Sequence, residues 1–153
     1  MSSELMALSP ERVAQLVPPP ARDALLSVLR EATALLPVAE AVVAACDAPG
    51  IKATEPARTA GRVSSAFHLM STRVLRLSIQ PSLRTHLAQL LEYHSELVGQ
   101  ASLAAYGHRS ERTERARGGG GLGTPAIELA QLATWLTRAL SSTSYTGRGT
   151  EDD

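Results

Sequence analysis

Apolar residues recur at every third or fourth position in four long segments of the chain, and prolines or glycines bound each segment. This spacing places the apolar side chains on one face of an α-helix. The segments cover about residues 20–47, 54–79, 82–106 and 125–140. The pattern therefore predicts four long amphipathic helices. The longest apolar face, in the first segment, comprises Leu25, Val28, Leu29, Ala32, Leu35, Leu36, Ala39, Val42, Val43 and Cys46.

Prolines mark where helices begin and end. Ser9 followed by Pro10 is typical of a helix start, because serine caps the first turn and proline suits the first helical position. A short helix is therefore predicted over about residues 10–17. Pro37 falls on the side of its helix opposite the apolar face, so we expect a kink there rather than two separate helices.

Two segments lack apolar periodicity. Residues 108–124 contain five glycines and are predicted to form a flexible loop, while the polar residues 141–153 are predicted to be a disordered tail. The remaining links between helices are short. The expected fold is all-α: an antiparallel, up-down-up-down four-helix bundle with a short extra N-terminal helix, forming a single domain over residues 1–140.

Several apolar residues point away from the faces that the periodicity assigns to the core. Single exposed apolar residues are common, but this number favours a second buried face on some helices. Either the short N-terminal helix covers part of the bundle, or a second copy of the chain or another protein does. A symmetric dimer is the commonest arrangement of the second kind. The residues concerned are Leu26, Leu75, Ile79, Leu103, Ile127 and Trp135.

Composition narrows the class of protein. Of the 153 residues, 44 % are hydrophobic and only 3 % aromatic, and the net charge is zero. These values favour an aliphatic globular core and disfavour nucleic acid or an acidic membrane as the partner. Cys46 is the only cysteine, and we find neither a signal peptide nor a membrane-spanning run, so we expect a cytoplasmic protein.

Positive charge is concentrated in one part of the chain despite the neutral total. Four arginines of the second long segment, Arg58, Arg62, Arg73 and Arg76, fall within an arc of roughly 60° on a helix. One hypothesis is a face that binds a polyanion or an acidic partner, since guanidinium groups match phosphate geometry. The alternative is that these side chains flank the core and pair with Glu31 or Glu40 across the bundle.

His94 occupies the middle of the apolar face of the third segment, between Leu90 and Leu97. With Tyr93 and His86 nearby on one flank, it could line a pocket that binds a small ligand, or serve as an acid or base. A structural histidine, hydrogen-bonded across the bundle to serine, threonine or backbone, is the competing interpretation. No glutamate stands three residues before any histidine, so the pattern of di-iron bundles is absent and no metal site or other cofactor is predicted.

No catalytic motif stands out in the sequence. We therefore expect a non-enzymatic helical-bundle protein that acts through protein–protein contacts, as an adaptor, regulator or assembly component, and that self-associates as a homodimer. The first alternative is a small-ligand-binding bundle with a pocket near His86, Tyr93 and His94. The second is polyanion binding through the four arginines of the second long segment.

Overall fold

The computed structural model describes residues 2–47, 54–105 and 122–148, with side-chain surroundings up to residue 142. Over these residues the chain is all-helical and contains no strand. No helix in this part of the chain is long and apolar enough to cross a membrane. The helices are α1 (Ser2–Met6), α2 (Pro10–Leu16), α3 (Pro19–Asp47), α4 (Thr54–Leu75), α5 (Pro81–Ala105) and α7 (Thr124–Arg148).

The predicted helix starts are confirmed. Ser9 caps α2: its hydroxyl oxygen accepts a hydrogen bond from the backbone NH of Arg12 at 3.3 Å, and Pro10 occupies the first turn. At the other end of α2, the Arg22 guanidinium donates to the carbonyls of Val17 and Ala14. The following helix, α3, runs unbroken through Pro37, whose ring is exposed as the periodicity predicts.

The second long helix ends earlier than predicted. Its last turn tightens beyond Leu75, where Arg76 and Leu77 donate backbone hydrogen bonds to carbonyls three residues earlier. The chain then turns, and Gln80 donates its backbone NH to the Leu16 carbonyl at 2.9 Å. Ile79 lies beyond the end of the helix, so its direction does not follow from the helical spacing. Its side chain lies in the core, with 5 % of its surface exposed.

The last helix ends later than predicted. Residues 141–148, which we expected to belong to a disordered tail, continue α7 to Arg148. No proline or glycine separates Leu140 from Gly147, so the polar composition does not itself stop the helix. Leu122, which fell inside the predicted 108–124 loop, is buried beside the start of α7. Residues 108–121 of that loop and residues 149–153 of the tail lie outside the described residues.

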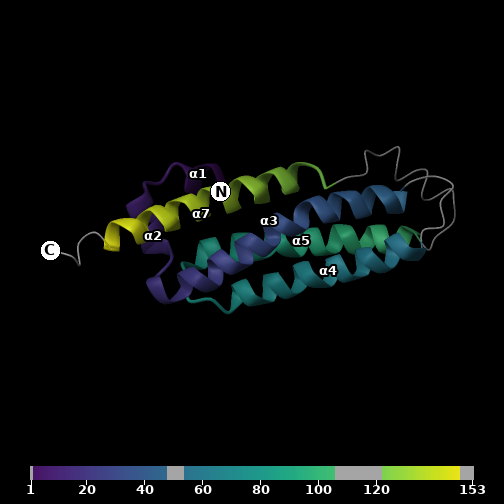
Figure 1. Cartoon of the computed structure of the whole chain (residues 1–153), viewed down its shortest axis with the longest axis horizontal. Coiled ribbons are helices and arrows are strands. Elements are labelled where there is room, and N and C mark those ends of the chain that lie inside the picture. The colour runs from purple at the N-terminus through teal and green to yellow at the C-terminus, as the bar shows by residue number, and fades with distance from the viewer. Residues whose placement is uncertain (1, 48–53, 106–121, 149–153) are drawn as a thin grey trace.

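The four long helices lie alongside one another, with α1 and α2 at one end (Figure 1). The closest pairing is α4 with α5, and α3 contacts α4, α5 and α7. Buried side chains from α2, α3, α4, α5 and α7 form one hydrophobic cluster. Its largest members are Phe67 and leucines, as the low aromatic content predicts.

Small residues bring α4 and α5 close together. Ser102 donates a hydrogen bond to the carbonyl of Ala57 at 2.8 Å, and Ser71 donates to that of Ala88 at 2.9 Å. The partners advance along α4 while they recede along α5, so the two helices are antiparallel. This seam, with Gly61 and Gly99 beside it, was not identified from the sequence because serine and glycine carry little weight in an apolar pattern.

The two N-terminal helices pack against α7. Val13 and Val17 are fully buried there. The short N-terminal helix thus covers part of the bundle, which is one of the two arrangements expected from the off-face apolar residues. It does not account for all of them, since Leu75, Leu103 and Ile127 each remain more than half exposed.

Candidate functional site

His94 lies in the core of the protein. It is completely buried on α5, and its Nδ1 donates a hydrogen bond to the Leu90 carbonyl oxygen at 2.7 Å. The bond places the proton of the neutral ring on Nδ1. The other ring nitrogen, Nε2, is buried and has no hydrogen-bond partner among the described residues. His94 therefore makes a structural hydrogen bond, but the bond joins it to its own helix and is not the bond across the bundle that the sequence predicted.

The surroundings of His94 keep its ring neutral. Burial lowers the pKa of His94, because the imidazolium ion loses its hydration, and this effect exceeds the opposing effects of the Leu90 carbonyl and the negative charge of Glu40. The ring packs against Phe67, with centroids 5.3 Å apart, and the Tyr93 ring lies nearly perpendicular to it, with centroids 6.2 Å apart. Such a ring is a poor general base near neutral pH.

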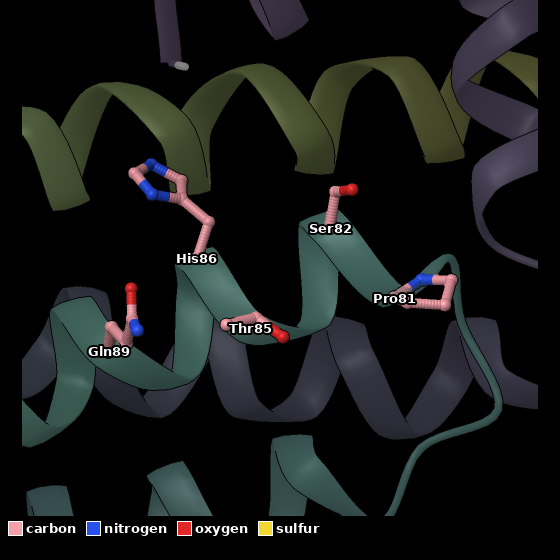
Figure 2. Close-up of a pocket in the computed structure, with 5 residues that line it drawn as sticks. All are labelled: Pro81, Ser82, Thr85, His86 and Gln89. Carbon is pink, nitrogen blue, oxygen red and sulfur yellow. The ribbon is translucent and has the colours of Figure 1, made fainter.

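The structure places His86, Tyr93 and His94 in different surroundings. His86 projects from α5 toward α7 and, with Pro81, lines a shallow surface hollow of about 340 Å³ (Figure 2). Its Nε2 lies 3.2 Å from a carboxylate oxygen of Glu128, so it links α5 to α7. Tyr93 is 45 % exposed on the outside of the same helix.

This arrangement offers no shared chemistry among the three side chains. His94 is sealed in the core, whereas His86 is engaged with Glu128 at the surface. Within the described ranges, no three or more His, Cys, Asp or Glu side chains lie close enough to hold a metal ion. The site predicted around His94 is therefore better described as part of the hydrophobic core.

Of the four arginines of the second long segment, two form ion pairs with residues that the structure describes and two do not. Arg73 lies 2.8 Å from Glu31 on α3, as the structural alternative predicts, and Arg58 lies 3.6 Å from Glu55 one turn earlier. The side chains of Arg62 and Arg76 make no ion pair or hydrogen bond within the described parts of the chain. Leu69, 61 % exposed, lies in the middle of the same helical arc. Half of the predicted cationic face is therefore already paired.

Another histidine contributes a contact that the sequence did not reveal. Nδ1 of His68 on α4 lies 2.9 Å from a carboxylate oxygen of Glu92 on α5. Both side chains are substantially exposed, so the pair adds little stability. It reinforces the antiparallel register of the two helices.

A groove lies between α3 and α7. It has a volume of about 580 Å³, and residues 26–34 and 133–141 supply its walls. Leu26, Leu29, Ala34 and Ala133 provide apolar lining, while Arg30 and Arg138 are the charged members. Leu26 is one of the residues that point away from the predicted core face, so the sequence held a signal for this surface. Only packing could show that α7 forms the other wall.

Two further hollows adjoin this groove, and we call the three together the α3–α7 surface. One, of about 380 Å³, shares Thr134 and Arg138 with the groove and adds Met6 and Trp135. The other, of about 290 Å³, shares Ala34 and adds Leu35 and other residues of α3 and α4. The hollows therefore form a connected surface across α7, α3 and α4.

Comparison with known proteins gave no matching family model, no similar curated protein and no similar solved structure.

Proposed function

We propose that this chain is a non-enzymatic helical bundle that acts in the cytoplasm by binding another protein through the α3–α7 surface. The single observation that carries the proposal is the connection of the three hollows on that surface through Thr134, Arg138 and Ala34. Small-molecule sites are enclosed and few, whereas protein contacts use broad, shallow surfaces with an apolar centre and a polar rim. The arrangement fits the second class.

The proposed architecture is an up-down-up-down four-helix bundle made of α3, α4, α5 and α7. Each long helix contacts the next one along the chain, and the last contacts the first. The α4–α5 pair is antiparallel, and α3 and α5 also touch, as expected for one diagonal of a bundle. The α3–α7 surface is then the seam between the first and last helices, which no short link holds closed.

Self-association through this or a neighbouring surface is part of the proposal. Leu69, Leu75, Leu103 and Ile127 are large apolar side chains more than half exposed, and Val38 is 45 % exposed. They lie on four different long helices, so one contact cannot cover all of them. A homodimer and a contact with a different protein can therefore use separate faces.

Site-specific photo-cross-linking in cells that naturally make the protein tests the proposal. A photoreactive residue replaces Thr134, at the junction of two hollows, and in a matched control it replaces Gln89, which is exposed on α5. We expect a covalent protein adduct from position 134 and little from position 89. An adduct at twice the 16.2 kDa chain mass would identify a homodimer as the contact. Equal labelling at both positions, or none at position 134, would contradict the proposal.

A further inference from the structure

The two charged side chains of the α3–α7 groove are unpaired cations on opposite walls. Arg30 on α3 and Arg138 on α7 are both exposed and line the groove. Neither side chain makes a hydrogen bond or ion pair with any residue that the structure describes. Among the residues with described side chains, none that is acidic lines the groove. The groove is therefore positively charged within a chain whose net charge is zero.

The threonine hydroxyl groups along the groove already donate hydrogen bonds within the protein. Thr33 donates to the Leu29 carbonyl at 2.8 Å, Thr134 to that of Ala130 at 2.9 Å, and Thr137 to that of Ala133 at 2.7 Å. Each bond turns a hydroxyl back onto its own helix, four residues earlier. The walls consequently offer few free hydrogen-bond donors beyond the two guanidinium groups and the Ser141 hydroxyl.

These walls restrict what can bind. An extended peptide needs partners for a row of backbone NH and CO groups, and the helical walls present no such row, because their own backbone groups are hydrogen-bonded within each helix. A helix satisfies its own backbone and presents only side chains. Each wall covers nine residues, or about 12 Å at the helical rise, which matches two turns of a bound helix. On the far side of Arg138, the neighbouring hollow continues the apolar surface to Trp135. The whole surface is therefore longer than one small amphiphilic molecule can cover.

We propose that the α3–α7 groove binds an acidic amphipathic helix of a partner protein. The apolar stripe of that helix lies on Leu26 and Ala34, above the buried Leu29 and Ala133, and its flanking Glu or Asp side chains pair with Arg30 and Arg138. This inference rests on the proposed function and specifies the chemistry of the partner. The bidentate guanidinium–carboxylate contact selects acidic over basic helices, and the apolar stripe supplies the affinity.

Binding of designed helical peptides, measured by fluorescence polarisation, tests the inference. Two peptides share a leucine stripe at helical spacing and carry either glutamate or lysine on its flanks. The proteins are the wild type, Arg30→Glu/Arg138→Glu, and the control Arg58→Glu/Arg62→Glu, which changes the net charge equally on α4. Circular dichroism checks that each variant keeps its helices.

The expected result is an exchange of preference. The glutamate peptide binds the wild type and the control alike, and its affinity falls by about tenfold or more in Arg30→Glu/Arg138→Glu. That variant instead prefers the lysine peptide. Affinity for the glutamate peptide that is equally low in the control would show a general charge effect and overturn the inference. Binding of dodecanoate through the two arginines, without peptide binding, would also overturn it.

The test separates this inference from the proposed function. Cross-linking at position 134 that persists in Arg30→Glu/Arg138→Glu would leave the protein contact in place and overturn the acidic-helix partner. Loss of cross-linking in that variant, together with the exchange of peptide preference, would support both.

Discussion

Ser64 on α4 and Ser95 on α5 bind each other's helix backbone. The Ser64 hydroxyl donates to the Ser95 carbonyl oxygen at 2.7 Å, and the Ser95 hydroxyl donates to that of Ser64 at 2.8 Å. The two hydroxyl oxygens lie 3.2 Å apart. Each serine therefore serves as both side-chain donor and backbone acceptor. The reciprocal bonds fix the separation and the register of the α4–α5 pair.

Two glycines beside this seam should respond differently to alanine. A Cβ at Gly99 would lie 3.1 Å from the Ser64 hydroxyl oxygen, which its hydrogen bond to Ser95 holds in place. At Gly61 the nearest atom, the Ser102 hydroxyl oxygen, is 4.0 Å away. Alanine gains roughly 0.5–1 kcal/mol over glycine within a helix. We therefore expect Gly61→Ala to stabilise the protein and Gly99→Ala to destabilise it, measured by urea unfolding. Equal gains at both sites would show that the seam is loosely packed.

Replacement of His94 should show that this residue is structural. His94→Ala leaves a cavity in the core and should lower the free energy of unfolding by about 1–4 kcal/mol. His94→Leu fills most of that space. It leaves no hydrogen-bond partner on another helix unsatisfied, because the Leu90 carbonyl belongs to the same helix turn. It also removes the buried, unpartnered Nε2. We expect the leucine variant to be as stable as the wild type or more so. A loss as large as that of alanine would indicate an unrecognised partner for the ring.

The burial of His94 also predicts a pH dependence of stability. Its pKa is lowered in the folded protein, so the unfolded chain takes up the proton first as the pH falls below about 6.5. Above that pH, His94 costs the folded protein no stability through proton uptake. As the pH falls from the pKa of His94 in the unfolded chain to its lower pKa in the folded protein, the free energy of unfolding declines. The melting temperature should therefore fall on mild acidification. His94→Leu should flatten this change, while His68→Gln, which removes an exposed histidine, should keep it.

The cationic arc of α4 is expected to bind polyanions weakly. Arg58 and Arg73 are each paired with a glutamate, which leaves only Arg62 and Arg76 available there. Retention on heparin should be negligible at physiological ionic strength, about 0.15 M, where exposed charges are largely screened. It should not change in Arg58→Ala/Arg62→Ala/Arg73→Ala/Arg76→Ala. Salt-sensitive retention that this variant abolishes would instead support the polyanion-binding alternative.

Local signals predicted the helices well and their ends less well. Ser9 and Pro10 set the start of α2, and Pro81 sets that of α5, because their effects act within one turn. The end of α4 was misplaced, and the chain beyond it makes a distant contact, the hydrogen bond from Gln80 to Leu16, which no local pattern reveals. The continuation of α7 beyond Leu140 shows the converse: a polar composition was taken for disorder where no helix-breaking residue intervenes before Gly147.

The candidate site shows the same division. His94 was identified from its position on an apolar face, and periodicity alone correctly predicted its burial. Its hydrogen-bond partner could not be predicted, because a serine, a threonine or a carbonyl on any helix would have satisfied the pattern. Leu26 was recognised as lying off the core face, but the wall opposite it belongs to a helix about one hundred residues away in the chain.

The sequence by itself determined which segments are helical and which face of each is buried, because both follow from spacing along a single helix. The tertiary structure alone decided which helices are neighbours and what their outer faces form together. The pairing of Ser64 with Ser95, and the joining of Arg30 and Arg138 across one groove, depend on how α-helices pack side by side. Packing brings distant residues together through shape and small residues, and a one-dimensional pattern does not carry that information.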